Sequence, residues 1–137
     1  MGRVLAIDYG KKRTGIAVTD PLRIIATALE TVATTDLLKF LEAYTKREPV
    51  DEFVVGMPMT LKGEDSEIAP LVRLFIEELK KNFPTKPIHL ADERFTSRMA
   101  QRAMIDGGMK KKDRRVKGNV DKISATIILQ SFMEQKR

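Results

Sequence analysis

The fold is decided by the stretch Val4-Leu5-Ala6-Ile7-Asp8-Tyr9-Gly10-Lys11-Lys12-Arg13-Thr14-Gly15-Ile16-Ala17-Val18-Thr19. Two runs of aliphatic and β-branched residues flank a turn that contains glycine, and this pattern predicts a pair of neighbouring strands. Asp8 closes the first run, where a charge is costly to desolvate unless it is paired, hydrogen-bonded or bound to a metal. Asp8 is therefore the first candidate for a functional residue. The alternative is an ordinary turn residue, because Asp is common before a glycine-containing bend.

Length and composition predict one globular domain spanning residues 1–137, with 42% apolar residues to form its core. The absence of cysteine excludes thiolate zinc sites and thiol nucleophiles. With a single histidine, a metal site would consist mainly of carboxylates, which suit Mg²⁺ or Mn²⁺. The sequence shows no signal-peptide pattern and no apolar stretch long enough to cross a bilayer. We therefore expect a soluble cytoplasmic protein without a membrane partner.

The net charge favours a polyanionic partner. It is +6 at neutral pH, and the isoelectric point is about 9.7. The densest basic run contains Lys110, Lys111, Lys112, Arg114, Arg115 and Lys117. The alternative interpretation of this run is a solvated charged face.

Strands and helices alternate along the rest of the chain. Strands are expected near residues 4–8, 15–19, 24–32, 53–57 and 88–91, and helices near residues 37–48, 68–82, 96–105 and from about 119 onward. Short connections predict an antiparallel meander for the first three strands, and helical crossovers predict parallel pairing of the first, fourth and fifth. Ligands bind at the carboxyl ends of such strands, where Asp8, Gly56-Met57-Pro58 and Asp92-Glu93 lie.

Two details of the helices are also predicted. Thr34, Thr35 and Asp36 offer the side chains that cap a helix beginning at Leu37. The buried stripe of the second helix is expected to consist of Leu71, Leu74, Phe75 and Leu79.

Four short motifs follow one another along the whole chain. They are Ile7-Asp8-Tyr9-Gly10 with Thr14-Gly15-Ile16-Ala17, Val55-Gly56-Met57-Pro58 with Gly63, Asp92-Glu93-Arg94-Phe95-Thr96-Ser97, and Lys117-Gly118-Asn119-Val120-Asp121-Lys122-Ile123-Ser124-Ala125. In this order they resemble the YqgF/RuvX family of small bacterial proteins, within the ribonuclease H-like superfamily. The resemblance implies an α/β, ribonuclease H-like fold: a five-stranded mixed sheet of order 3-2-1-4-5, flanked by helices.

The resemblance also implies a metal-dependent nuclease that hydrolyses phosphodiester bonds in 5′-end maturation of pre-16S rRNA. The alternatives are a Holliday-junction resolvase acting on four-way DNA and a non-catalytic rRNA-binding factor. Two Mg²⁺ or Mn²⁺ ions about 3.5–4 Å apart stabilise the attacking and leaving oxygens in such chemistry. Under this hypothesis Asp8, Glu93 and Asp121 are both the catalytic acids and the metal ligands.

Each acid also has an interpretation without chemistry. One residue of the pair Asp92-Glu93 is expected to be a metal ligand, and we expect it to be Glu93. The alternative is that these acids only form a surface ion pair with Arg94. Asp121 is also explained as a first-turn acid that the helix dipole favours. The turn after Asp8 looks like the first phosphate loop of the actin and sugar-kinase ATPases as well, but those enzymes need two such domains.

Phosphate contacts are expected from three groups of residues. They are Lys11, Lys12 and Arg13 beside Asp8, then Arg94, Thr96 and Ser97 at a helix start, and finally the basic run from Lys110 to Lys117. Thr96 or Ser97 is equally explained as a helix cap. Pre-rRNA is the favoured partner and branched DNA the alternative. A monomer or weak homodimer is expected, because no long apolar seam indicates a tight dimer.

Overall fold

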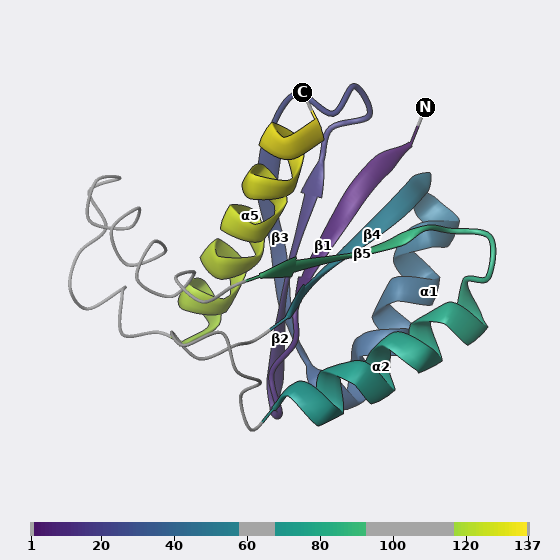
Figure 1. The fold of residues 1–137 in the computed structure, drawn as a ribbon, viewed down its shortest axis with the longest axis vertical. Coiled ribbons are helices and arrows are strands. Elements are labelled where there is room, and N and C mark those ends of the chain that lie inside the picture. The colour runs from purple at the N-terminus through teal and green to yellow at the C-terminus, as the bar shows by residue number, and fades with distance from the viewer. Residues whose placement is uncertain (1, 58–67, 93–116, 137) are drawn as a thin grey trace.

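In the computed structural model of the protein, a five-stranded mixed sheet separates two layers of helices (Figure 1). Its strands are β1 (Arg3–Asp8), β2 (Arg13–Thr19), β3 (Ala26–Ala33), β4 (Val50–Met57) and β5 (Ile88–Asp92), in the order β3-β2-β1-β4-β5. Strands β1 and β2 pair antiparallel, as do β2 and β3, whereas β4 lies parallel to both β1 and β5. The predicted sheet order and strand directions are confirmed.

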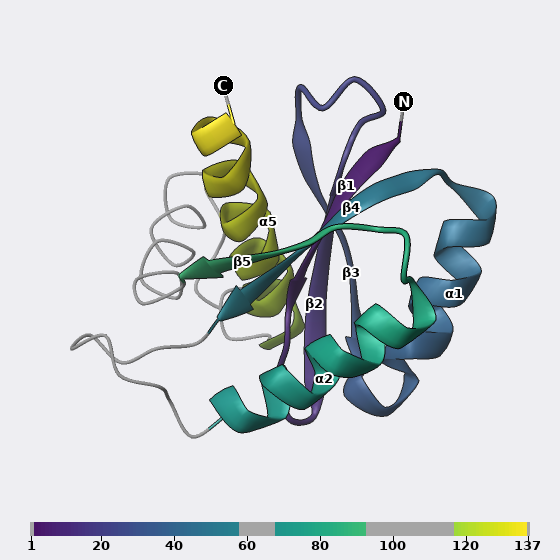
Figure 2. The same cartoon turned by 45° about the vertical axis from the view of Figure 1, so that its right-hand side comes forward.

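The structure describes residues 2–57, 68–92 and 117–136, and for Asp92 and residues 117–122, 135 and 136 it describes the backbone alone. A short 3-10 turn, η1 (Thr34–Asp36), leads into helix α1 (Leu37–Arg47), and α2 (Ala69–Asn82) lies between β4 and β5 in the chain. Helix α5 (Lys117–Lys136) covers one face of the sheet, and α1 and α2 cover the other (Figure 2). The helix predicted over residues 96–105 lies outside the described residues. None of the described helices has the length and apolar character that a membrane crossing requires.

Each face of the sheet has its own core, because successive side chains of a strand point to opposite sides. In β1, Leu5 and Ile7 belong to the first core, under α1 and α2. Val4 and Ala6 belong to the second core, under α5. β1 is therefore buried on both faces along its central part, as expected for a strand in a sheet covered on both sides.

Strand β3 begins two residues later than predicted, at Ala26 instead of Ile24. The cause is the Asp20 carboxylate, whose Oδ1 accepts hydrogen bonds from the amides of Ile24 (2.7 Å) and Ile25 (2.8 Å). These bonds hold both residues in the turn between β2 and β3, and the hydrogen bond from Ile25 is the main cause that lowers the pKa of Asp20. The β-branched side chains alone favoured a strand here, and the local carboxylate outweighed them.

The prediction of a side-chain cap for α1 is wrong. Neither η1 nor α1 has a side-chain hydrogen bond at its N-terminal cap. Thr34 instead donates its hydroxyl hydrogen to the Gly10 carbonyl oxygen, 2.6 Å away in the turn between β1 and β2. The side chain that was predicted to cap the helix therefore makes a tertiary hydrogen bond instead.

The predicted stripe of α2 is half correct. Its buried residues are Ala69, Val72, Phe75, Ile76 and Leu79, whereas Leu71 is 38% and Leu74 65% exposed. The predicted and the observed stripes share Phe75 and Leu79 and both have helical spacing, so periodicity alone did not separate them. The two stripes differ at Val72 and Ile76, which pack in the first core and so face the observed stripe toward the sheet. Phe75, common to both stripes, lies against Tyr9 with ring centroids 5.1 Å apart.

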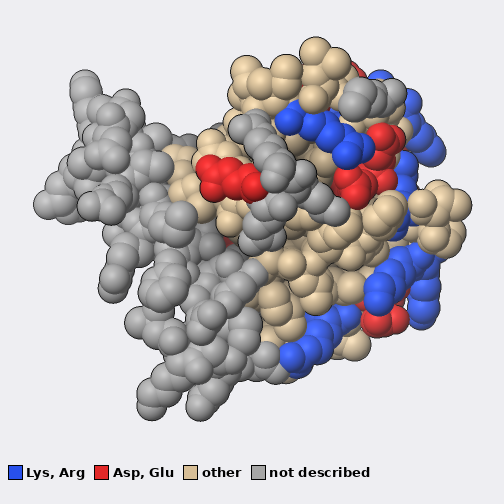
Figure 3. Space-filling model, turned by 45° about the horizontal axis from the view of Figure 1, so that its top comes forward, with Lys and Arg blue, Asp and Glu red and all other residues tan. Residues whose placement is uncertain are grey.

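The amino edge of the sheet, where β1, β4 and β5 begin, carries charges of both signs side by side (Figure 3). Arg23 forms ion pairs of 2.9 Å with Asp51 and with Glu52, and Glu52 also lies 2.9 Å from His89 Nε2. The Gly2 amide donates to Asp51 at 2.8 Å, and this bond is the main cause that lowers the pKa of Asp51. These contacts join the start of the chain, the β2–β3 turn and two strands.

Replacing a buried and an exposed leucine of the same helix will test the orientation of α2. We expect Leu79→Ala, at a fully buried position, to lower the free energy of unfolding by about 2–5 kcal/mol because it leaves a cavity. Leu74→Ala is the control and should change it by no more than about 0.5 kcal/mol. Urea unfolding followed by circular dichroism measures both. Equal losses would contradict the observed orientation.

Candidate active site

The parallel strands β1, β4 and β5 end at one edge of the sheet, with Asp8, Met57 and Asp92 as their last residues. The register places Ile7 opposite Val55 and Met57 opposite Asp92, so the three strands end within one residue of the same level. Because neighbouring strands are about 4.8 Å apart, the backbones of Asp8 and Asp92 are separated by about 10 Å. We call this boundary the carboxyl edge.

Asp8 lies on the α5 side of the sheet. It follows Val4 and Ala6 at two-residue spacing, and both of those side chains pack in the core under α5. Asp8 is partly buried, the first polar position after a run of fully buried residues. Helix α5 runs across this face from the side where β4 and β5 end (Figure 1). Its Phe132, near the far end, lies against His89 with ring centroids 4.9 Å apart.

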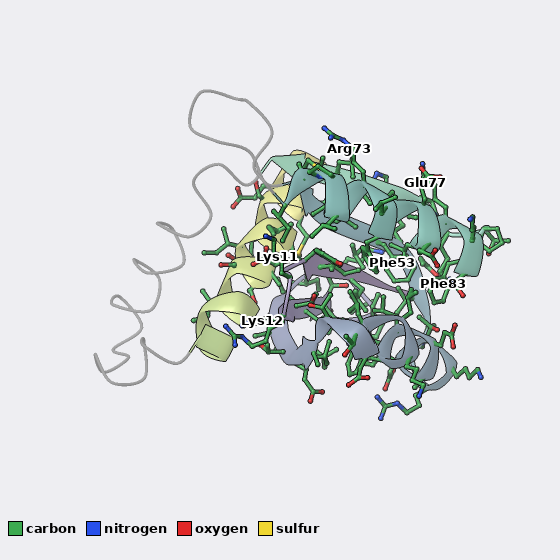
Figure 4. The ribbon with its side chains drawn as sticks, turned by 90° about the horizontal axis from the view of Figure 1, so that it is seen from below. Lys11, Lys12, Phe53, Arg73, Glu77 and Phe83 are labelled. Carbon is green, nitrogen blue, oxygen red and sulfur yellow. The ribbon has the colours of Figure 1, made fainter. Side chains whose placement is uncertain are left out.

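The turn that follows Asp8 places basic side chains at the carboxyl edge. Lys11 and Lys12 are exposed, and Arg13 is partly buried at the start of β2. Tyr9 is partly buried and packs against Phe75 of α2. Seen from below, Lys11 and Lys12 come from the turn at the edge of the sheet, apart from the charged residues on the outer side of α2 (Figure 4).

The predicted site residues fall into three groups. Asp8, Lys11, Lys12 and Arg13 are described with their side chains, and the first three of them lie together at the carboxyl edge. Lys117 and Asp121 lie in the first turns of α5, where the backbone alone is described. The remaining predicted residues lie outside the described part of the chain: Glu93, Arg94, Thr96, Ser97, Lys110, Lys111, Lys112, Arg114 and Arg115.

The chemistry that is possible at the carboxyl edge depends on which carboxylates lie together there. Within the residues that the structure describes, no group of three His, Asp or Glu could hold a metal ion. Two of the three predicted ligands, Glu93 and Asp121, have no described side chain. The described features that support a metal site at this edge are therefore the strand ends and the position of α5.

Two threonines contact the turn in a way that was not predicted from the sequence. Thr14 is fully buried at the start of β2, and its hydroxyl lies 2.9 Å from that of Thr34. Both hydroxyls contact the backbone of Gly10. The two residues are 20 positions apart, so only the pairing of β2 with β3 brings them together.

Comparisons with known proteins agree with this geometry. A family model with the description "RuvX: Holliday junction resolvase" matches residues 2–135. A protein of Amoebophilus asiaticus named "Putative pre-16S rRNA nuclease" is 55% identical, over 97% of this chain and 94% of its own length. A protein of Phocaeicola vulgatus with the same name is 53% identical, over 100% of this chain and 99% of its own.

Solved structures extend the likeness to the fold. The structure described as "T. thermophilus RuvC in complex with Holliday junction substrate" matches with a TM-score of 0.60 and 18% identity, covering 99% of this chain and 96% of that chain. A second structure of Thermus thermophilus RuvC matches with a TM-score of 0.55 and 15% identity, over 98% and 95% of the two chains. At these identities the likeness shows the shared fold.

Adding a methyl group at Gly10 will test how tightly the turn is closed. A Cβ at this position would overlap the Arg13 carbonyl oxygen, a backbone atom that cannot move without opening the turn. We expect Gly10→Ala to lower the free energy of unfolding by about 1–3 kcal/mol and to weaken nucleic-acid binding, measured by thermal unfolding and a filter-binding assay.

The control for this variant is Gly2→Ala. Its Cβ would also be too close to a neighbour, but that neighbour is the flexible Asp51 carboxylate at the amino edge. We therefore expect a smaller loss of stability and unchanged nucleic-acid binding. A Gly10→Ala variant as stable as wild type would contradict the tight turn.

Proposed function

This chain belongs to the RuvX family, and on that premise we propose that it is a metal-dependent nuclease that hydrolyses phosphodiester bonds at the 5′ end of pre-16S rRNA. The observation that carries the proposal is the position of Asp8, on the central strand of a ribonuclease H-like sheet and three residues before a pair of exposed lysines. The description of the family model favours a second candidate, cleavage of four-way DNA junctions. The curated relatives favour the rRNA substrate.

The course of α5 supports a second acid beside Asp8. Asp121 precedes Ala125 by one helical turn, and Ala125 is fully buried in the core between α5 and the sheet. Residues four apart share one face of a helix, so position 121 continues the row of α5 that faces the sheet. Asp8 lies on the same side of the sheet, at the edge from which α5 starts.

The pleat of β5 supports Glu93 as the third acid. His89 lies against Phe132 of α5, and Ala91 packs against the core under the same helix. Since strand positions alternate between faces, a continuation of this row by two residues leads to position 93. This parity favours Glu93 over Asp92 as the ligand, and it remains a proposal about a residue outside the described part.

The donor set of these three acids suits Mg²⁺ or Mn²⁺. Carboxylates are the ligands that these ions take, whereas the only histidine, His89, already contacts Glu52. When bound, a pair of such ions supplies stabilisation of the attacking and leaving oxygens and lowers the pKa of the attacking water. Asp8, Glu93 and Asp121 would hold the ions. The chain's own cations would bind the phosphates on either side of the cut.

The distribution of charge supports a nucleic-acid substrate. Residues 93–116 carry eight Lys or Arg and three Asp or Glu, so most of the net charge of +6 lies in this segment of the sequence. Lys11 and Lys12 add exposed positive charge at the carboxyl edge. Such contacts give affinity without sequence preference and weaken with salt. We further propose that the protein acts in the cytoplasm as a monomer or weak homodimer.

Replacing the Asp8 carboxylate by its isosteric amide will test the nuclease proposal. We expect Asp8→Asn to lower cleavage of a pre-16S rRNA fragment by about 100-fold or more, since even residues that only orient metal ligands are worth about 10–100-fold. Gel assays with Mg²⁺ or Mn²⁺, and with a four-way DNA junction in parallel, measure the rate and the substrate preference. EDTA should abolish cleavage, and added metal should restore it.

The matched control is Glu77→Gln, at a carboxylate on the outer side of α2 that is 67% exposed (Figure 4). Its cleavage rate should equal that of wild type. If Asp8→Asn cuts as fast as wild type, the metal mechanism is wrong. If neither protein cuts but both bind RNA, the non-catalytic binding factor becomes the better hypothesis.

The salt dependence of binding will test the role of the two exposed lysines. Each phosphate contact on a single strand contributes about 0.7 to the slope of log K against log salt. We expect Lys11→Ala/Lys12→Ala to reduce that slope by about 1–1.5. Lys80→Ala/Lys81→Ala, at the C-terminal end of α2, removes the same charge elsewhere and should leave the slope unchanged. Identical slopes for both double variants would exclude a specific role for Lys11 and Lys12.

A further inference from the structure

Three hydrogen bonds tie the turn after Asp8 and the start of β2 to the segment that begins α1, and a fourth lies within the turn itself. Thr34 donates its hydroxyl hydrogen to the Gly10 carbonyl oxygen at 2.6 Å, and its backbone amide donates to the Lys12 carbonyl oxygen at 3.0 Å. The hydroxyls of Thr14 and Thr34 are 2.9 Å apart, and the Gly10 amide donates to the Thr14 hydroxyl at 3.5 Å.

The direction of these bonds follows from the single hydrogen on each hydroxyl. Because Thr34 gives its hydrogen to Gly10, Thr14 must be the donor between the two threonines. Thr14 in turn accepts from the Gly10 amide. The bonds therefore form a closed ring that runs from the Gly10 amide through both hydroxyls and back to the Gly10 carbonyl. Both backbone polar groups of Gly10 are therefore hydrogen-bonded to these two hydroxyls.

The ring connects the turn to the rigid part of the molecule. Thr34 comes directly after Ala33, the last residue of β3, which pairs with Arg13 of β2. Two residues beyond η1, Leu38 packs against the first core, and Leu37 and Leu41 are fully buried in it. The backbone that carries Lys11 and Lys12 is thus held by strand pairing on one side and by the core on the other.

We infer that Thr34 and Thr14 are positioning residues for nucleic-acid binding at the carboxyl edge. Their hydroxyls hold the turn in one conformation, so Lys11 and Lys12 keep a constant position relative to Asp8. A turn that is already ordered loses less entropy when it grips a phosphate, and this preorganisation strengthens binding. The inference rests on the proposed function, since it assigns these lysines to the substrate backbone.

A threonine-to-valine series will test the inference, because valine keeps the shape of threonine and removes its hydrogen bonds. We expect Thr34→Val and Thr14→Val to raise KM for the pre-16S rRNA fragment about three- to tenfold, the effect of one or two lost hydrogen bonds. kcat should stay within about twofold of wild type, since Asp8 is held by its own strand. Thr34→Ser keeps the hydroxyl and should restore the KM of wild type.

Thr19→Val is the matched control. Thr19 is also fully buried in β2, and its hydroxyl also accepts a backbone hydrogen bond, from the Val4 amide at 2.9 Å, but it lies at the amino edge. It should lose stability like the other variants and keep the KM of wild type. If the role of Thr34 were purely structural, Thr34→Val would lower the fraction of protein that is folded and active. The apparent kcat would then fall while KM stayed unchanged.

Two further measurements separate this inference from the proposed function. Amide hydrogen exchange at residues 10–13 should become faster in Thr34→Val and not in Thr19→Val. RNA binding in EDTA should be weaker for Thr34→Val about three- to tenfold. If wild type cuts nothing and Thr34→Val still weakens binding, the nuclease proposal fails and the positioning role stands. An unchanged KM and binding constant in Thr34→Val, or an equal change in Thr19→Val, would overturn the inference.

Discussion

The burial of β1 on both faces is the constraint on which the rest of the structure depends. Residues Val4 to Ile7 are at most 2% exposed and alternate between two cores. Such a strand can satisfy its backbone only through neighbours, which are β2 on one side and β4 on the other. Helices must then cover both faces of the sheet. The polar chemistry of this region is confined to the ends of the strands, and Asp8 is the first carboxylate beyond the buried run.

The two edges of the sheet use their charges differently. At the amino edge, Arg23 is paired with Asp51 and Glu52, so opposite charges hold three segments of the chain together. At the carboxyl edge, Lys11 and Lys12 are exposed, and backbone hydrogen bonds to threonine hydroxyls hold the turn that carries them. Ion pairs at the carboxyl edge would compete with an anionic substrate for the same lysines. Neutral hydroxyls order the turn without using the positive charge of these lysines.

Those features that depend on short-range patterns could be predicted from the sequence. Short connections and helical crossovers predicted the strand directions, the family resemblance implied the sheet order, and the charge at the end of an apolar strand made Asp8 the first candidate for a functional residue. Features that depend on which backbone group one particular side chain bonds to could not. The Asp20 carboxylate accepts a hydrogen bond from the Ile25 amide, and β3 starts later as a result. The Thr34 hydroxyl bonds to the Gly10 carbonyl instead of capping the helix. In α2, two stripes had equal periodicity, and only the packing of Val72 and Ile76 in the first core distinguishes the observed one.

The position of α5 at the end of the chain has a consequence for biosynthesis. The core that contains Val4, Ala6, Ala17 and Val54 is completed by residues Ala125 to Met133. Chains are made from the N-terminus, so the sheet and its first core can assemble while this second face still awaits its helix. An unfinished chain therefore exposes apolar strand residues and lacks the helix that carries Asp121. Under the proposed mechanism, the protein becomes competent to cut nucleic acid only after α5 has been synthesised and has packed on the sheet.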